Sequence, residues 1–248
     1  MVDLAVSGLS RSFWHREAEI PAVKEANLRC RAGDFVGIVG KSGCGKTTLL
    51  KLIAGLEKPD AGELKLSGPA GESPRLGVMF QDPRLLPWLT VEQNLRLAFP
   101  AKRRPQDTAD LHRNLDLVGL GAWKDAFPRS LSGGMAQRAA LARTLCRKPH
   151  LLLLDEPFSA LDAFTRKQLR EELGEIWKSL GMTVILVTHD IEEAVYLSDQ
   201  VIHMRNGAIH AAIPIGLPRP RDCREPAFQE RCRALEQLPW GAGRVSAS

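Results

Sequence analysis

The chain has 248 residues, 44% hydrophobic and 25% charged, which is an ordinary globular composition with room for one large domain or two small ones. Its net charge of +5 is spread among acidic residues, and the densest basic cluster, residues 102–104, is too short for the basic block typical of nucleic-acid binding. We therefore expect a sizeable buried core. Charge alone does not decide whether nucleic acid is a partner, although none is expected.

The apolar runs and the cysteines indicate whether the protein spans a membrane, is secreted or contains disulfides. The longest runs, residues 151–154 and 183–187, are far shorter than the roughly 18 residues of a membrane-spanning helix. Residues 1–10 lack the basic start and long apolar stretch of a secretory signal, so we expect the protein to stay in the compartment where it is made. The five cysteines show no metal-ligand spacing and are expected to be reduced thiols: Cys30, Cys44, Cys146, Cys223 and Cys232.

The amino-terminal part predicts strands and then a strand, a loop and a helix. Residues 3–35 are expected to form short strands, with a hairpin where the polar stretch 15–18 interrupts the apolar pattern. The apolar run 35–39 then leads into a glycine-rich loop and an apolar-periodic segment, residues 48–54. This order is typical of an α/β protein.

The rest of the chain predicts a helical insertion, a second α/β part and a tail. A helical pattern punctuated by prolines runs from residue 82 to about 146, and two buried strands at 151–154 and 183–187 flank the helical stretch 162–180. After a turn at 205–207, a proline-rich stretch precedes a helical segment near 225–236. We expect a core domain over 1–215, made of 1–81 and 147–215 with the helical subdomain 82–146 inserted, followed by a peripheral tail, 216–248.

Residues 40–47, Gly-Lys-Ser-Gly-Cys-Gly-Lys-Thr, fit the phosphate-binding loop pattern completely and lie between a predicted strand and a predicted helix. The glycines let backbone N–H groups turn toward phosphate oxygens, and the helix N-terminus favours an anion. Lys46 is expected to neutralise the β- and γ-phosphates, and Thr47 to offer its hydroxyl to Mg²⁺. The predicted ATP-binding residues here are Gly40, Lys41, Ser42, Gly43, Cys44, Gly45, Lys46, Thr47 and Thr48.

Two adjacent carboxylates end the predicted strand 151–154. Asp155 can hold Mg²⁺ through water, while Glu156 faces the γ-phosphate as the candidate general base. An acidic residue that merely caps the next turn is the alternative, but the phosphate loop in the same chain favours the catalytic reading.

Residues 131–138, Leu-Ser-Gly-Gly-Met-Ala-Gln-Arg, place Ser-Gly-Gly at the start of a helical stretch, which predicts a second anion-binding nest. A plain capped helix would explain Ser132 but would leave Gly133 and Gly134 without a reason. The order of phosphate loop, nest and paired carboxylates resembles the ABC transporter ATPases over roughly residues 3–215. The resemblance implies a P-loop NTPase core, a mixed sheet with amino-terminal antiparallel strands and an inserted helical subdomain, and it implies ATP hydrolysis coupled to transport.

The resemblance also implies a homodimer with two composite ATP sites. In that family the signature of one protomer covers the ATP held by its partner, and the residues at those positions here are Leu131, Ser132, Gly133, Gly134 and Gln137. Residues 159–162 resemble the loop that couples the two sites, with Ser159, Leu161 and Asp162 at its functional positions.

Three further residues match positions with roles in the family. Gln81 resembles the glutamine that touches Mg²⁺ and the attacking water, and His189 resembles the histidine at the γ-phosphate; alone, they would be a polar loop residue and a structural histidine. Either Phe13 or Trp14 resembles the aromatic residue on which adenine stacks, and Phe13 is the preferred candidate over a core role. The expected Mg²⁺ ligands are Thr47, Gln81 and Asp155.

Residues 80–94 resemble the nitrate, sulfonate and taurine branch of bacterial importers. This implies a permease docking near residues 82–94, an indirect partnership with a periplasmic or extracellular solute-binding protein, and a peripheral location on the cytoplasmic face of the inner membrane. Two alternatives stay open: the ATPase of an exporter or lipid-extraction system, and a non-transport ABC ATPase acting on nucleic acid or ribosomes.

Overall fold

A computed structural model describes residues 1–16, 18–68, 73–100, 104–159 and 161–240. Contacts within the chain divide it into two units. The first unit contains Met1 and residues 68–183, and the second contains residues 2–67 and 184–248. Each unit is described by itself below.

The first unit contains a parallel pair of strands, β5 (Leu76–Met79) and β6 (Leu151–Asp155), in which Leu76 lies opposite Leu151. All five residues of β6 are buried, as expected for an unbroken apolar run in a parallel sheet covered on both faces. Strand β5 was not predicted, because its four residues give too short a pattern to separate from a loop.

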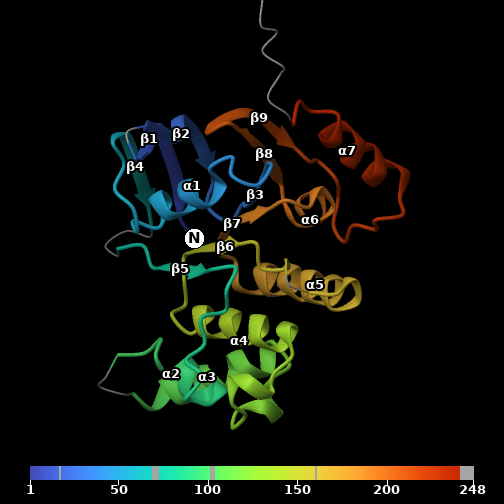
Figure 1. The fold of residues 1–248 in the computed structure, drawn as a ribbon. Helices are drawn as coiled ribbons and strands as arrows, with labels where there is room; N and C mark the ends of the chain where they lie inside the picture. Colours follow the sequence, from blue (N-terminus) through green and yellow to red (C-terminus); the bar gives the residue numbers. More distant parts are fainter. Residues whose placement is uncertain (17, 69–72, 101–103, 160, 241–248) are drawn as a thin grey trace, which may run out of the picture. The chain divides into compact units, whose positions relative to one another are not determined.

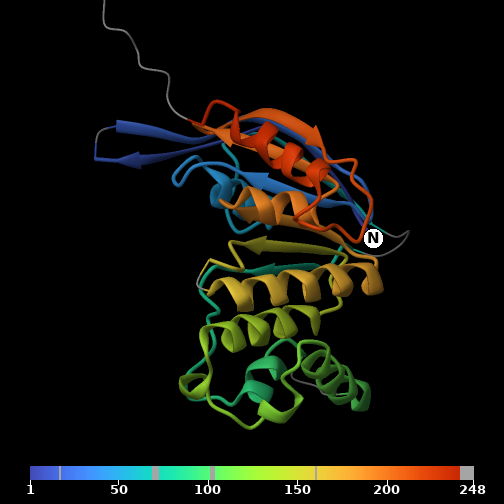
Figure 2. The same ribbon diagram turned by 90° about the vertical axis from the view of Figure 1, so that its right-hand side faces the viewer.

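Helices make up the rest of this unit, and Figures 1 and 2 show α4 between α5 on one side and α2 and α3 on the other. Residues 82–90 are not helical, contrary to the expectation that helix begins at residue 82. Pro83 and Pro87 disfavour helix in the residues before them, and a capping box between Thr90 and Gln93 begins the first helix. The helices are α2 (Val91–Arg96), α3 (Pro105–Leu117), the short 3₁₀ helices η1 (Gly121–Trp123) and η2 (Pro128–Ser130), α4 (Gly133–Leu145) and α5 (Ala163–Leu180).

The second unit begins with an antiparallel sheet in the order β2-β1-β4. The hairpin of β1 (Asp3–His15) and β2 (Ala18–Cys30) turns in the predicted place, but each strand has 13 residues rather than being short. The register between the two strands is irregular from Val6 to Ser12, which interrupts the alternation of apolar residues expected along a strand. Strand β4 (Ala61–Ser67) completes the sheet.

Parallel strands form the centre of this unit. Strand β3 (Phe35–Val39) lies between β7 (Thr183–Thr188) and β8 (Gln200–Arg205), parallel to both. Strand β9 (Ala208–Pro214) returns antiparallel to β8 through a turn at Asn206 and Gly207, both in the left-handed region (φ 50° and 85°). Helix α1 (Lys46–Ile53) follows β3, and α6 (Ile191–Leu197) follows β7.

The predicted tail helix forms as α7 (Pro226–Glu236) and packs against α6 (Figure 1). Its Phe228, Cys232 and Leu235 are buried in one cluster with residues of α6, β3 and β8. Arg221, also buried, donates to the carbonyls of Val195, Tyr196, Ser198 and Leu217 and so satisfies the carboxyl end of α6. Burial lowers the pKa of this guanidinium to about 10. The tail is therefore part of the second unit's core up to residue 240.

Within the described residues, no helix has both the length and the apolar character needed to cross a membrane.

Candidate functional site

The glycine-rich loop leaves the wholly buried strand β3 and leads into α1. A Cβ on Gly40 would lie 2.3 Å from the carbonyl oxygen of Met204, and one on Gly45 (φ 102°) would lie 2.0 Å from that of Ala22. No side chain larger than hydrogen fits at either position, and Gly45 also needs a backbone conformation that other residues avoid. The loop's curl is thus enforced by its neighbours in the second unit.

Lys46 lies inside this loop. It is only 5% exposed, and its Nζ donates to the carbonyl oxygens of Gly40 (2.7 Å) and Lys41 (3.1 Å). The amino-terminal turn of α1 has no side-chain cap and no acidic residue, while Ser42 and Thr47 are exposed. An anion at this turn would meet a buried ammonium group and uncapped N–H donors.

His189 lies at the same edge of the sheet as the loop. Val39 and Thr188 are register partners in the parallel pair β3–β7, so Gly40 and His189 follow the carboxyl ends of neighbouring strands. The His189 side chain is exposed. Ligands of open α/β sheets bind at this edge, which fits the predicted position of the histidine.

A buried network fixes the backbone around His189. The Thr188 hydroxyl donates to Glu193 Oε2 (2.5 Å) and accepts from the Asp190 N–H (3.1 Å), and Asp190 Oδ1 accepts from the Glu193 N–H (3.1 Å). Sequence reasoning missed Glu193. The spacing of Asp190 and Glu193 at the start of a helix is that of a capping box, but it does not predict the contact of Glu193 with the Thr188 hydroxyl.

The two aromatic candidates lie near the turn of the β1–β2 hairpin, opposite Ile20 and Glu19. Phe13 is 38% exposed, and the Arg11 guanidinium lies 4.9 Å from its ring centroid. Trp14 is 73% exposed. A cation thus lies over the Phe13 ring, and the exposed part of the ring is available for stacking.

In the first unit, the paired carboxylates lie at the end of β6, and the second of them, Glu156, contacts Gln81. Asp155 is the last, buried residue of the strand, and Glu156 has a left-handed backbone (φ 46°). Gln81 Nε2 donates to Glu156 Oε2 (3.5 Å) and to the Ser159 hydroxyl (3.2 Å), which itself donates to the Glu156 carbonyl (3.1 Å). The structure therefore brings together three residues that lie up to 78 positions apart.

Ser132 caps α4, its hydroxyl accepting from the Met135 N–H (3.2 Å), and Ser132 and Gly133 are exposed at the helix start. Gly134 is buried, and a Cβ there would lie 2.5 Å from Thr165 Cγ2 of α5. Gly134 is therefore explained by close packing of α4 against α5, even if α4 is only a capped helix. The expectation that such a helix gives no reason for either glycine is corrected for this one. Leu131, just before the cap, is half-buried.

Gln137 has a different place from the one expected of it. It is 1% exposed, and its Nε2 donates to the Gln81 carbonyl oxygen (2.8 Å). The helix turns this side chain inward, so it is not offered at the exposed end of α4 where a partner's nucleotide would be met. Its burial is a tertiary property that the motif alone does not reveal.

The loop after Glu156 leads into α5, and its last residue, Asp162, caps that helix. Asp162 caps α5 by accepting from the Phe164 and Thr165 N–H groups, and hydrogen bonds, first that of the Thr165 hydroxyl, lower the pKa of its carboxyl. Leu161 is buried, and Ser159 contacts Gln81 as described above. Ala160, in the same predicted loop, lies outside the described residues.

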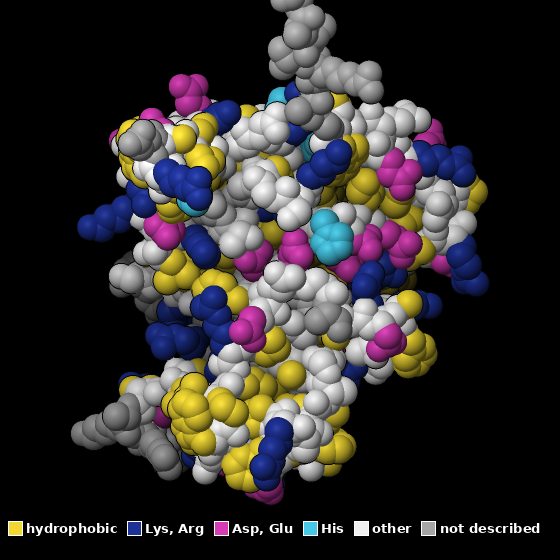
Figure 3. All heavy atoms as spheres, viewed as in Figure 1, with side chains coloured by type: hydrophobic (Ala, Val, Ile, Leu, Met, Phe, Trp, Pro, Cys, Tyr) yellow, Lys and Arg dark blue, Asp and Glu magenta, His cyan; other side chains and the backbone are white. Residues whose placement is uncertain are grey.

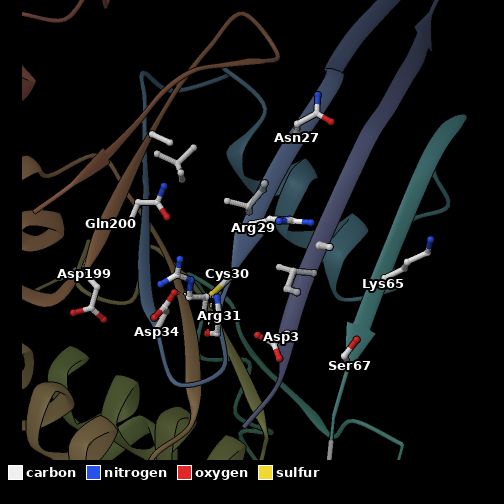
Figure 4. Close-up of a pocket in the computed structure, with 15 residues that line it drawn as sticks. Asp3, Asn27, Arg29, Cys30, Arg31, Asp34, Lys65, Ser67, Asp199 and Gln200 are labelled. Carbon is white, nitrogen blue, oxygen red and sulfur yellow. Dashed lines mark hydrogen bonds between the residues drawn. The ribbon is translucent and has the colours of Figure 1, made fainter.

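A separate pocket of about 750 Å³ lies in the second unit, lined by residues of β1, β2, β4 and β8 (Figure 4). Three of its carboxylates, those of Asp3, Asp34 and Asp199, accept hydrogen bonds from backbone N–H groups. Asp34 precedes β3 whereas Gly40 follows it, so this pocket lies at the opposite end of the strand from the phosphate loop. Its acids maintain the fold and are distinct from the candidate site.

Comparisons with known proteins agree on one family. A family model described as "ABC transporter" matches residues 23–159. The chain is 46% identical to "Aliphatic sulfonates import ATP-binding protein SsuB 2" of Paracoccus denitrificans, over 96% of this chain and 91% of that protein. It is 41% identical to "Aliphatic sulfonates import ATP-binding protein SsuB" of Bacillus cereus, over 96% of both.

Solved structures agree with this. The dimeric structure of MJ0796, a bacterial ABC transporter cassette, superposes with a TM-score of 0.76 and 28% identity over 87% of this chain and 100% of that one. A second MJ0796 dimer, described as a post-hydrolysis state bound to ADP and Pi, gives a TM-score of 0.75 at 28% identity over the same shares.

Proposed function

We propose, from the premise that this chain belongs to the ABC transporter family of ATPases, that it is the ATP-hydrolysing subunit of an importer for aliphatic sulfonates or a similar small anion such as nitrate or taurine. The observation that carries the proposal is similarity along nearly the whole chain to proteins named as aliphatic sulfonates import ATP-binding proteins. The Gln81–Glu156 contact supports the proposed roles of these two residues in hydrolysis.

ATP is the substrate, and residues 40–48 would hold its phosphates. The crowded glycines at 40 and 45 and the buried ammonium of Lys46 support this role, because a tight N–H-lined curl around a cation suits a polyphosphate. Phe13 would stack on adenine.

Glu156 would act as the general base for water attacking the γ-phosphate, with Gln81 orienting that water and His189 contacting the phosphate. The support is geometric: Gln81 and Glu156 are within hydrogen-bond reach, and the Thr188–Glu193 network holds the backbone next to His189. A correctly placed base typically contributes about 10² to 10⁴ in rate.

Mg²⁺ fits the donors available. Thr47, Gln81 and Asp155 offer hydroxyl, amide and carboxylate oxygens, the hard donors that this ion prefers. Among the described residues no three His, Cys, Asp or Glu side chains group as a metal site. An ion bound to this hydroxyl, amide and single carboxylate would complete its coordination with water and the substrate's own phosphates. When bound, the ion would neutralise charge on the β- and γ-phosphates.

We further propose a homodimer in which Ser132 and Gly133 of one protomer cover the ATP of the other, with Ser159, Leu161 and Asp162 lying near the dimer axis. Exposure of the α4 start and the dimeric form of the similar cassette support this arrangement. Gln137 would serve this site indirectly, through Gln81.

Residues 82–94 would receive the permease. They run beside a groove of about 550 Å³ whose lining includes Leu89, Gln93, Arg96 and Leu97. Hydrophobic side chains gather over the helical part of the first unit (Figure 3), and Trp88, Leu97, Trp123 and Phe127 are exposed there. An exposed apolar area beside a groove is typical of a protein contact.

We assign the parts of the chain accordingly. Residues 82–146 would be the helical subdomain that couples to the permease, residues 1–81 and 147–215 the nucleotide-binding core, and residues 216–248 a tail. The protein would be peripheral to the cytoplasmic face of the membrane.

Uptake in the source organism tests the substrate. Deleting the gene should abolish uptake of a labelled alkanesulfonate, and the wild-type gene should restore it whereas Glu156→Gln should not. Unchanged uptake of alkanesulfonate, taurine and nitrate in the deletion strain would contradict the proposal. Accumulation of a solute inside the deleted cells would instead favour an exporter.

A further inference from the structure

The loop that follows Gln81 is held from outside by α4. Arg143, half-buried on this helix, donates from Nη2 to the Pro83 carbonyl and from Nη1 to the Arg84 carbonyl, both at 2.8 Å. Gln137, earlier on the same helix, donates to the Gln81 carbonyl at 2.8 Å. Three carbonyls of one loop are therefore bound by two side chains of one helix.

The later part of the loop is held by the buried Asn94 of α2, which accepts from the Leu86 N–H (2.7 Å) and donates to the Leu86 carbonyl (3.1 Å). The earlier part, which Arg143 binds, contains an unfavourable backbone conformation. Residues 80–90 form neither helix nor strand, and Arg84 has a left-handed backbone (φ 49°). The Arg84 N–H bonds to Asp82 Oδ1 (3.0 Å), and its guanidinium lies 3.9 Å from the Phe80 ring centroid. A conformation of this kind persists only when its surroundings determine it.

We infer that Arg143 is a positioning residue for ATP hydrolysis, which fixes the backbone after Gln81 so that the Gln81 amide stays against Glu156. The inference rests on the proposed roles of these two residues. Arg143 touches neither of them and acts through the loop. Because Ser132 caps α4, the same contact links the loop to the helix that begins at the signature.

The chemistry of the contact requires arginine. A planar guanidinium presents donors in a rigid fork that can bind two successive carbonyls at once, whereas a lysine ammonium is a single charge on a flexible stem. Hydrogen bonds from a charged donor are also stronger than neutral ones. Arg143→Lys should therefore keep part of the restraint, and Arg143→Met should remove it while filling similar volume.

Two measurements on the full-length chain test this. Hydrogen exchange of the peptide spanning residues 80–86 should become roughly tenfold faster in Arg143→Met and change less in Arg143→Lys, as expected for losing one or two charged hydrogen bonds. The kcat of ATP hydrolysis should fall roughly tenfold in the methionine variant, while KM for ATP stays unchanged because residues 40–48 are untouched.

Arg147→Met is the matched control. Arg147 follows α4 and donates to the Ala98 carbonyl (3.4 Å), not to the loop after Gln81. The Arg147→Met variant should leave unaltered both the hydrogen exchange of residues 80–86 and the kcat of ATP hydrolysis. If Arg143→Met fails to fold, Arg143→Lys replaces it as the test, with smaller changes expected in the same two measurements.

Three results would overturn the inference: unchanged exchange at 80–86 in Arg143→Met, unchanged kcat despite faster exchange, or equal effects from Arg147→Met. A wild-type chain that binds ATP without hydrolysing it would contradict the proposed function instead. Exchange needs no turnover, so it would still decide whether Arg143 holds the loop.

Discussion

Glu156 combines a carboxylate at the end of a buried strand with a left-handed backbone (φ 46°), a conformation that costs a non-glycine residue about 1–3 kcal/mol. The Ser159 hydroxyl, bonded to the Glu156 carbonyl, helps to hold that conformation. The side chain of Glu156 accepts a hydrogen bond from Gln81, and residues that adopt such backbone conformations cluster at functional sites. The sequence predicts both residues, but only the structure reveals the strained backbone and Ser159's part in it.

At the same scale, substitution can show whether Phe13 or Trp14 contacts adenine. Phe13→Ala should weaken ATP binding about three- to tenfold, because an aromatic stacking contact contributes roughly 0.5–1.5 kcal/mol. Trp14→Ala, its neighbour on the same strand, should leave the affinity unchanged. Equilibrium binding of a fluorescent ATP analogue measures both. Loss of affinity in the tryptophan variant alone would transfer the adenine contact to Trp14.

At the scale of elements, the tail is tied to β8 and α6. His203 of β8 is 1% exposed, and the Trp240 ring packs edge-on against it at 4.6 Å between centroids. Neither ring nitrogen of His203 has a hydrogen-bond partner among the described residues. Nearby, Arg205 donates to the Pro239 carbonyl (3.1 Å). The end of the tail thus packs over a buried histidine, and the burial favours the neutral form of its imidazole.

This predicts acid sensitivity of the folded state. Burial first, then His210 and Arg205, lower the pKa of His203 below its ordinary value of 6.5. Above pH 6.5 the imidazole is neutral in both folded and unfolded chains. As pH falls below 6.5 the unfolded chain binds the proton first, so the free energy of unfolding decreases until the lower folded pKa is reached.

Urea unfolding at pH 7.5 and 5.5 measures the effect. His203→Leu should lose less stability between the two pH values than the wild type, because the group that titrates is gone. His15→Gln, a change at an exposed histidine, should behave like the wild type. An equal pH dependence in wild type and His203→Leu would contradict this role for His203.

At the scale of the whole molecule, the α/β class and the helical insertion could be predicted because their signals are local. A buried strand followed by a glycine-rich loop identifies β3 and α1, and helical periodicity with capping residues identifies α5 and α7. Strands β4, β5, β8 and β9 were not predicted. Strand β4 is largely exposed and β5 has only four residues, while for β8 and β9 only the turn between them was predicted.

The missed parts of the site share a cause. Arg143 and Glu193 were not predicted, and Gln137 was predicted in the signature but without its contact to Gln81. All three act through side-chain contacts with distant residues, and such pairings are decided by tertiary packing. Sequence patterns place residues on elements but do not say which distant carbonyl a side chain meets. Arg221 is a further example, because its four carbonyl partners lie in α6 and in the turn before the arginine.

The central claim is that two copies of this chain share composite ATP sites, each using one protomer's Glu156 and the other's Ser132. The most direct test is Mg²⁺-dependent ATPase activity with size measurement in ATP, for wild type, Glu156→Gln and Ser132→Arg. We expect both variants to lose turnover, by about 10² or more for the glutamate change, and only Glu156→Gln to form an ATP-stabilised dimer. Normal hydrolysis by Ser132→Arg, or near-normal turnover by Glu156→Gln, would contradict the account.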